Sequence, residues 1–415
     1  MQSSVQRANV PLVLAGAQAL RRIERVRTAG RWHRQTSAWG GWCVKKDLAE
    51  NLLAKIMGWT DAEKAMHRAR LESFASYKYD EYQQFSPGRR FIESLALWLA
   101  QFAAGSERRT AYDFVCNRLI FISMDEMNHL VELSFPTIIR PLLIAATAAE
   151  LGVDPDHIKA ILATREYRMR LRRTLVLGMS DGARTDWFRR ANPQDMSNEQ
   201  VFHAYDVSEG KTGDMVKKLK SALRQILDRD STDEESRFEH VVLLDDFSAS
   251  GTSAIRRDDD GVWDGKIPKI VAMLDAADGL GSAIADAGVT LVIVVYVASE
   301  QAIVHTRELL ESLTFSKGSI LFDVVHRLGA EIRLDDVRDA PMLALANQDR
   351  YFDPDVDDRH GAVGKKSKRL GYAEGRLPVV LGHNTPNNSI FLIWAPDETT
   401  VRGLFPRVDR HRKLQ

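Results

Sequence analysis

The sequence has little cysteine, no long apolar run and no net charge, and each lack excludes a class of protein. Its two cysteines, Cys43 and Cys116, are too few for a disulfide framework and lack metal-ligand spacing, which favours a reducing cytosol. No apolar run approaches the roughly 18 residues that cross a bilayer. The most apolar stretch, Val289–Val297, has the length of a buried strand. Basic and acidic residues are equal at 57, so overall charge does not favour the coating of nucleic acid.

The chain is long enough for two domains, because 415 residues exceed the roughly 250 to 300 that one core organises. We expect a helical domain over residues 1–172, where apolar residues recur at helical spacing. Its expected helices are Leu48–Met57, Thr60–Tyr79, Arg89–Phe102 and Ile158–Arg172, the last of them capped by Asp154. The arginines among the first 35 residues indicate a basic surface helix or, alternatively, an organelle transit peptide.

Residues 173–415 have a different texture, in which short β-branched runs alternate with helical segments. This alternation implies a mainly parallel sheet with helices on both faces, so the expected fold class is α + α/β. Ligands gather at the carboxyl ends of strands in such folds, which points to the loops after Gly178 and Leu244. The expected strands are Thr174–Gly178, His240–Leu244, Val289–Val297, Ile320–Val325, Leu377–Gly382 and Ile390–Trp394.

The segment from His240 to Ser253 carries the main chemical signal. It reads as a buried strand, then two carboxylates, Asp245 and Asp246, then a turn of small residues and a helix that begins at Ala254. A helix N-terminus attracts phosphate through its unpaired amides and its dipole, and carboxylates accept hydrogen bonds from a sugar diol. The pattern predicts a ribose 5-phosphate site, the alternative being a plain turn with capping serines. The expected phosphate-binding residues are Ser248, Ser250, Gly251, Thr252 and Ser253.

This order of residues resembles the signature of the type I phosphoribosyltransferase family. In that family the acidic pair holds the 2′ and 3′ hydroxyls of the ribose and the turn holds the 5′-phosphate. The resemblance implies that Asp245 and Asp246 are catalytic, because carboxylates can stabilise the oxocarbenium character that develops when the bond at the anomeric carbon breaks. The reaction would be phosphoribosyl transfer or nucleotide base release, with Mg²⁺ organising a pyrophosphate group.

A second loop follows the strand at Thr174–Gly178. It corresponds to the loop that receives pyrophosphate in the type I family, although a mobile catalytic hairpin of that family is replaced between the two loops. Glycine and alanine permit close backbone approach, and the planar fork of Arg184 suits phosphate oxygens. Asp181 departs from the pattern, because an acid repels pyrophosphate unless a metal intervenes. It indicates either a metal contact or a ligand without pyrophosphate. The expected loop residues are Ser180, Asp181, Gly182, Ala183 and Arg184.

A polar turn near the C-terminus offers donors and acceptors suited to a base edge or a carboxamide. Tyr372 and Trp394 are possible stacking surfaces beside it, and the alternative is that the segment is only a turn between two strands. The expected base-recognition residues are His383, Asn384, Asn387 and Asn388.

Together these features resemble a phosphoribosyltransferase-like family of bacterial conflict and anti-phage systems, over Thr174 to Arg407. The resemblance implies a toxic cytoplasmic effector that acts on a phosphoribosyl compound or nucleotide. Its partners would be a regulatory protein or, as in some retrons, a reverse transcriptase and noncoding RNA, with residues 1–172 as the docking domain. One alternative is a sensor that binds the ligand without turnover. Another is a subunit of a nucleic-acid complex, which would bind through the N-terminal arginines together with Lys365, Lys366, Lys368 and Arg369.

Overall fold

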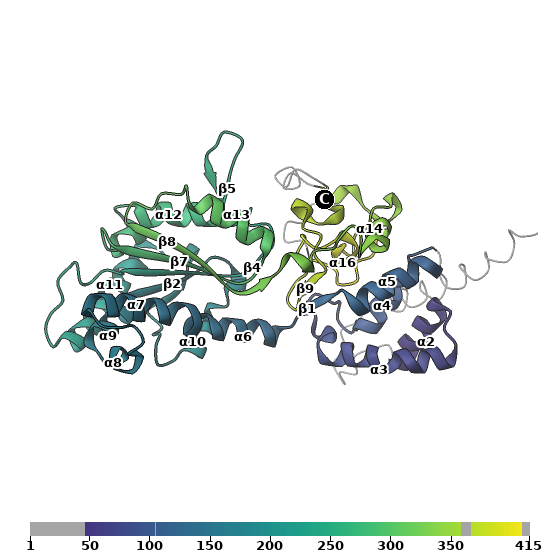
Figure 1. The fold of residues 1–415 in the computed structure, drawn as a ribbon, viewed down its shortest axis with the longest axis horizontal. Helices are drawn as coiled ribbons and strands as arrows, with labels where there is room; N and C mark the ends of the chain where they lie inside the picture. The colour runs from purple at the N-terminus through teal and green to yellow at the C-terminus, as the bar shows by residue number, and fades with distance from the viewer. Residues whose placement is uncertain (1–45, 104, 358–366, 409–415) are drawn as a thin grey trace, which may run out of the picture. The chain divides into compact units, whose positions relative to one another are not determined.

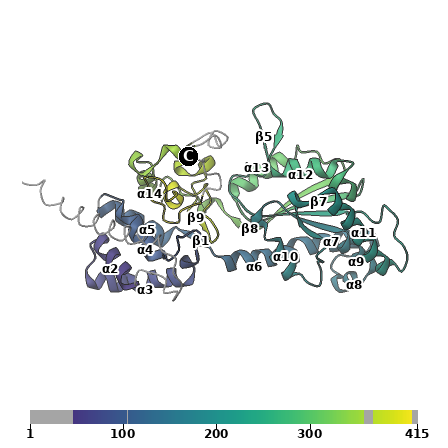
Figure 2. The ribbon, with the colours of Figure 1, turned by 180° about the vertical axis from the view of Figure 1, so that it is seen from behind.

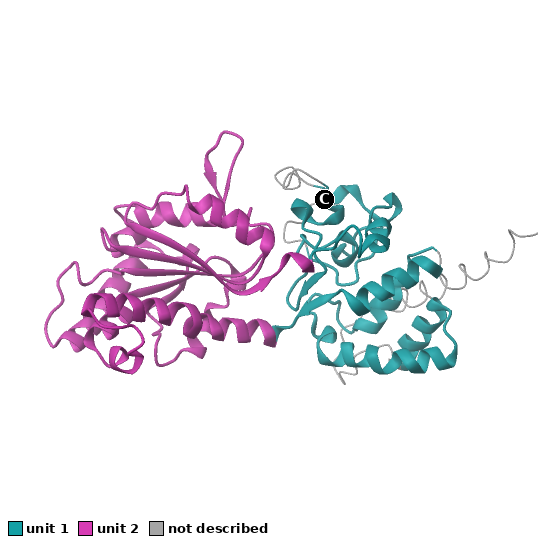
Figure 3. Cartoon of the chain, in the orientation of Figure 1, with its two compact units in different colours: residues 1–124, 333–415 teal, residues 125–332 magenta. Residues whose placement is uncertain are grey.

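The computed structural model describes residues 46–103, 105–357 and 367–408. It divides the chain into two compact units, and Figure 3 shows each in its own colour. Unit 1 comprises Met1–Met124 and Arg333–Gln415, and unit 2 comprises Asp125–Ile332. The predicted boundary between residues 172 and 173 is therefore not where the structure divides the chain. The C-terminal residues return to the unit that holds the N-terminal helices, and the helices from residue 125 onward join the sheet.

Unit 2 is built on a parallel sheet of five strands in the order β3-β2-β4-β7-β8, and helices flank it on both sides (Figure 1, Figure 2). This arrangement confirms the predicted α/β fold. The expected strands at Thr174, His240, Val289 and Ile320 all lie in this sheet. The strands are β2 (Thr174–Gly178), β3 (Val201–His203), β4 (His240–Ser248), β7 (Val289–Ser299) and β8 (Gly318–Leu328).

One face of this sheet is covered by α11 (Glu209–Leu227) and α12 (Lys266–Asp275), whose apolar side chains share a core with alternate residues of the central strands. In α11 those side chains recur four residues apart, at Met215, Leu219 and Leu223, which places them on one side of the helix. The remaining helices of unit 2 are α8 (Ile158–Leu162), α9 (Arg165–Arg172), α10 (Thr185–Ala191) and α13 (Glu300–Leu310), besides those at its N-terminal end.

The predicted helix Ile158–Arg172 is divided in two. Thr164 starts α9 by accepting a hydrogen bond from the backbone N–H of Tyr167 at 3.2 Å. Asp154 caps no helix, because its carboxylate accepts from the N–H of Asp156 at 2.9 Å and closes a turn before α8. The apolar spacing continues across Thr164 and so predicts one helix. The side chain of Thr164 instead caps the start of a second helix at this point.

One helix, Met124–Leu151, has a length and composition that could cross a membrane, with a mean hydropathy of 1.4 over an 18-residue window. It consists of α6 (Met124–Ser134), the π-helical turn η2 (Phe135–Ile139) and α7 (Arg140–Leu151). Of that window 44% is buried inside the protein, and Phe135 packs edge to face against Phe188 of α10. Core helices pass the same test of length and composition, so one such helix is weak evidence of a membrane span.

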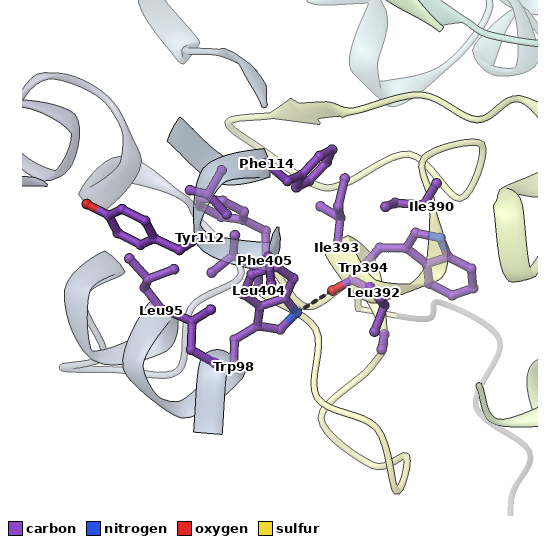
Figure 4. Packing of buried hydrophobic residues seen from close by; sticks show 14 of the residues in the cluster. Leu95, Trp98, Tyr112, Phe114, Ile390, Leu392, Ile393, Trp394, Leu404 and Phe405 are labelled. Atoms are coloured by element: carbon purple, nitrogen blue, oxygen red, sulfur yellow. Dashed lines mark hydrogen bonds between the residues drawn. The ribbon is translucent and has the colours of Figure 1, made fainter. Parts of the chain in front are cut away.

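Unit 1 encloses an aromatic core made by both ends of the chain. Figure 4 shows Trp98 beside the C-terminal residues, with its Nε1 donating to the backbone oxygen of Leu392 at 2.7 Å. Phe405, fully buried, packs against Phe91 and Tyr79. The helices are α2 (Lys46–Met57), α3 (Asp61–Tyr77), α4 (Phe91–Ala100), α5 (Gly105–Asn117), α14 (Ala340–Ala346) and α16 (Phe391–Trp394).

Of the two strands expected in the C-terminal part, one is present but in a different sheet, and the other is a helix. The strand expected at Leu377–Gly382 exists as β9 (Val379–Leu381), but it pairs in parallel with β1 (Ile120–Ile122) and not with the five-stranded sheet. The run Ile390–Trp394 forms the short helix α16. Every residue of that run is buried, so it lacks the alternation of polar and apolar positions that distinguishes a strand from a buried helix.

His240, at the start of β4, gives a testable dependence of stability on pH. It is 6% exposed, and Arg170 Nη1 lies 3.1 Å from its Nε2. Burial, with help from Arg170 and Arg173, lowers the pKa of His240 to about 4 from an ordinary 6.5. Between these values the unfolded chain binds a proton that the folded chain does not. Acidification from pH 6.5 to 4 is therefore expected to remove about 3 kcal/mol of stability.

Urea unfolding at a series of pH values measures this loss. The variant His240→Gln should flatten the slope of unfolding free energy against pH in that window. The matched control is His129→Gln, since the side chain of His129 is 66% exposed. An equal slope in the wild type and in His240→Gln would contradict the assignment.

Candidate functional site

The two loops named by the sequence meet at the carboxyl edge of the sheet in unit 2. β2 and β4 are neighbours in register, so that Gly178 pairs with Leu244. The N–H of Met179 continues this pairing by donating to the oxygen of Leu244 at 2.8 Å. The next residues along the chain, Ser180 on one strand and Asp245 on the other, are hydrogen-bonded through their side chains. The expected juxtaposition of the acid pair with the Ser180–Arg184 loop is thus present.

Asp245 is the buried member of the acid pair, with 4% of its surface exposed. Its Oδ1 accepts a hydrogen bond from Ser180 Oγ, and its Oδ2 lies 2.8 Å from Lys266 Nζ. Burial raises the pKa of the Asp245 carboxyl, the Lys266 ammonium opposes this effect, and the negative charge of Asp246 adds to it. Lys266 was not predicted, because the hairpin of residues 256–264 separates it from the loop in sequence.

Asp246 is half-buried and lies against the second loop. A Cβ atom placed on Gly182 would be 2.1 Å from Asp246 Oδ2 and 2.4 Å from its Cγ, so only glycine fits there without a shift. Burial lowers the pKa of Arg184, and the charge of Asp246 opposes that effect. Arg184 has a left-handed backbone with φ of 48° and donates to Asn128 Oδ1 at 3.0 Å. The loop therefore places a cation and a glycine close to the half-buried carboxylate of Asp246.

Tyr296 of β7 is hydrogen-bonded to the Ser180–Arg184 loop. It is fully buried, and its hydroxyl donates to the backbone oxygen of Ala183 at 2.6 Å. Burial, followed by the charges of Asp246 and Asp245, raises the pKa of Tyr296 well above its ordinary value, so it stays a proton donor. Its position inside an apolar strand gave the sequence no reason to select it. The only available signal was a hydroxyl near the carboxyl end of a buried strand.

The Ser248–Ser253 turn does not lead into a helix, so the predicted helix start at Ala254 is wrong. The N–H groups of Ala254 and Ile255 both donate to Gly251 O, at 2.9 and 3.0 Å, which closes a single turn. The chain then forms the hairpin of β5 (Arg256–Arg257) and β6 (Trp263–Asp264), and α12 begins only at Lys266. No helix dipole is therefore available at Ala254 to attract a phosphate. Only the turn itself could bind one.

The turn still presents a compact set of small hydroxyl residues. Ser250 Oγ and Thr252 Oγ1 lie 2.9 Å apart. Ser248 is 8% exposed, and within the described part of the chain its buried hydroxyl has no hydrogen-bond partner. Gly251 has φ of 78°, and a Cβ there would lie 2.7 Å from His305 Cδ2, so a side chain is excluded. An unpaired buried hydroxyl is uncommon in folded proteins, so Ser248 stands out within the turn.

Asp181 is exposed and interacts with a tyrosine that follows β3. Tyr205 Oη donates to Asp181 Oδ1 at 2.5 Å, and this bond raises the pKa of Tyr205 to about 12. The ring of Tyr205 stacks on His203 with centroids 5.3 Å apart. Among the described residues no group of three or more His, Cys, Asp and Glu side chains is placed to hold a metal ion. A metal at Asp181 would therefore take most of its ligands from the bound molecule or from water.

The predicted base-recognition turn belongs to unit 1, whereas the acid pair belongs to unit 2. Its polar groups make contacts within unit 1. Asn388 Nδ2 donates to Tyr372 O at 3.0 Å, Asn387 O accepts from the Tyr372 N–H at 2.8 Å, and His383 O accepts from Gln84. The side-chain oxygen of Asn384 is buried without a partner among the described residues. Trp394, only 4% exposed, cannot stack on a ligand.

Of the basic residues predicted to bind nucleic acid, the structure describes Lys368 and Arg369. Lys368 is 6% exposed with its Nζ on Val356 O at 2.8 Å, and Arg369 pairs with Asp349 at 2.8 Å. Both residues thus make contacts inside unit 1. Lys365, Lys366 and the N-terminal arginines lie outside the described residues.

A parallel α/β sheet with an acid pair, a serine-rich turn and a glycine loop at its carboxyl edge defines a phosphoribosyltransferase-like protein. The model of the PRTase-CE family matches residues 95–407, well over half of the chain, so the protein belongs to that family. No curated protein and no solved structure matches the chain.

Proposed function

We propose that the protein binds a phosphoribosyl compound at the carboxyl edge of its sheet and acts on the anomeric carbon. The observation that carries this proposal is the meeting of Asp246 with Gly182, which brings the acid pair against the second loop. Asp246 would accept hydrogen bonds from the ribose hydroxyls, and Ser248, Ser250, Gly251, Thr252 and Ser253 would take the 5′-phosphate. Arg184 would face the group that leaves.

Two reactions suit these groups. In transfer, the C1–O bond of PRPP breaks, pyrophosphate leaves with the electron pair, and an acceptor atom bonds to C1. In base release, the C1′–N bond of a nucleotide breaks, the base leaves with the electron pair and takes up a proton, and water supplies the hydroxyl. Both pass through a positively charged sugar, which the negative charge of Asp246 stabilises. Mg²⁺, held by Asp181 together with phosphate oxygens and water, would neutralise the charge of the leaving pyrophosphate.

Product analysis tests the proposal. Purified protein is incubated with PRPP or with each nucleoside 5′-monophosphate, with and without Mg²⁺, and pyrophosphate, ribose 5-phosphate and free base are quantified. The expected result is one of these products at a rate proportional to enzyme concentration. Saturable binding without product over a long incubation would instead establish a ligand sensor. Absence of both binding and product would reject the phosphoribosyl site.

We also propose a setting for this activity, on the family resemblance. The protein would be a cytoplasmic effector of anti-phage defence, with unit 1 as the docking surface for a regulatory protein or for a reverse transcriptase and its RNA. Metabolite profiles of bacteria that express the wild type or Asp246→Asn test the effector role. Loss of a nucleotide or PRPP pool only with the wild type is expected. Identical pools and growth in both strains would contradict it.

A further inference from the structure

The buried position of Asp245 raises the question of which acid serves the ligand. Both oxygens of Asp245 are engaged, Oδ1 by Ser180 and Oδ2 by Lys266 at 2.8 Å, and 4% of the residue is exposed. A buried carboxylate is strongly disfavoured unless it is paired and hydrogen-bonded, and these two partners supply both conditions. Little of Asp245 remains accessible to a sugar hydroxyl.

Lys266 connects this pair to the serine-rich turn. Its backbone N–H donates to Ser253 O at 3.2 Å, and the next N–H, of Ile267, donates to Ala254 O at 2.9 Å. Gly265 lies so close to the turn that a Cβ there would be 2.6 Å from Ala254 O. The first residues of α12 are therefore seated directly on the turn, and the Lys266 side chain extends from there to Asp245.

Ser180 connects the same carboxylate to the second loop. Its backbone oxygen accepts from the N–H of Ala183 at 3.0 Å, so its position is linked to the residues that follow it. A single carboxylate thus contacts the first residue of the Ser180–Arg184 loop and the helix that holds the Ser250–Ser253 turn. Asp246, which is half-buried and lies against Gly182, has the more accessible carboxylate.

We propose that Asp245 is a positioning residue: held between Ser180 and Lys266, it couples the Ser180–Arg184 loop to the Ser250–Ser253 turn, and Asp246 alone of the pair takes the ribose hydroxyls. The inference rests on the proposed function and assigns its two acids different roles, positioning for Asp245 and ribose binding for Asp246. Ordering of one loop by its ligand then fixes Asp245 and, through Lys266 or Ser180, favours the bound form of the other loop. Binding at the two loops becomes mutually reinforcing.

Calorimetric titration with ribose 5-phosphate and with inorganic pyrophosphate, each alone and in the presence of the other with Mg²⁺ throughout, measures this coupling. In the wild type each probe is expected to raise the affinity for the other about tenfold. Ser180→Ala and Lys266→Met should both bring that factor close to one. In Lys266→Met, which removes no residue assigned to ligand binding, the affinity for each probe alone should change much less. Lys266→Arg should retain coupling, since it keeps the charge.

Lys269→Met is the matched control, because Lys269 lies on the same helix and pairs with Asp264 at 2.9 Å with a side chain 73% exposed. It should couple like the wild type. Wild-type coupling in Ser180→Ala and Lys266→Met, or no coupling in the wild type, overturns the role of Asp245 while the proposed function stands. Binding of neither probe by the wild type overturns both. If Lys266→Met does not fold, Ser180→Ala, which removes one hydroxyl, decides alone.

Discussion

Replacement of Asp246 by asparagine is expected to reduce turnover of the phosphoribosyl substrate about a hundredfold or more while the protein stays folded. The amide is nearly the same size, so the contact with Gly182 persists. It carries no negative charge, however, and an enzyme loses a factor of this order when one group that stabilises transition-state charge is removed. The rate of product formation under saturating substrate is the measurement, with thermal unfolding as the check on folding.

The control for this substitution is Asp323→Asn. Asp323 is an exposed acid on β8 of the same sheet, and its Oδ1 accepts a hydrogen bond from the neighbouring Val324 N–H at 2.8 Å. Asp323→Asn removes one negative charge from unit 2, as Asp246→Asn does. A general electrostatic effect on activity would therefore appear in both variants. Full activity in Asp246→Asn would mean that this carboxylate does not act on the sugar.

Four strands of the five-stranded sheet could be predicted, because each is a local run of apolar, mostly branched residues. The three-residue edge strand β3 was not predicted. Val289–Val297 is a run of branched apolar residues of strand length, and the structure extends it only to Ser299. Neighbouring parallel strands end at the same edge, so a pair of acids after one strand and a glycine loop after another could be expected to meet. The close approach of Asp246 to Gly182 in the structure agrees with this expectation.

The C-terminal segment could not be placed, because its partners are distant in the sequence. β9 is a strand, as expected, but its partner β1 lies more than 200 residues earlier, and no local pattern encodes the pairing. The wholly buried run at Ile390–Trp394 suits a strand and a buried helix equally. The predicted domain boundary was placed where the sequence pattern changes at residue 173. That local change cannot show that the C-terminal residues belong to the same unit as the N-terminal helices.

The missed helix start at Ala254 has a local explanation. Asp260-Gly261 is a tight-turn signal, and the structure uses it in the β5–β6 hairpin, where Asp258 Oδ1 accepts from the N–H groups of Asp260 and Val262. That hairpin separates the serine-rich turn from α12 in the sequence. The spacing of residues around the turn therefore gives no indication that Lys266 lies beside Asp245. The charge that pairs with Asp245 comes from a residue 21 positions away.

Gly182→Ala tests the geometry of the site with a single methyl group. Its Cβ would lie 2.1 Å from Asp246 Oδ2, well inside van der Waals contact, so either the loop or the carboxylate has to move. Because the proposed ligand contacts both the Ser180–Arg184 loop and Asp246, a shift of either group displaces a binding residue. Ribose 5-phosphate affinity is therefore expected to fall about a hundredfold, since a misplacement of about 1 Å has effects of that order. Calorimetric titration measures the loss.

Gly210→Ala is the matched control, since Gly210 lies in α11 of the same unit and nothing is within 4 Å of a Cβ at that position. A double-mutant cycle on thermal stability then identifies the cause. If the methyl group collides with Asp246, Gly182→Ala should destabilise the wild type and have little effect in an Asp246→Ala background, where the carboxylate is gone. Equal destabilisation in both backgrounds would show that the methyl group disturbs the loop itself. Unchanged affinity in Gly182→Ala would mean that the ligand does not depend on the positions of the loop and Asp246.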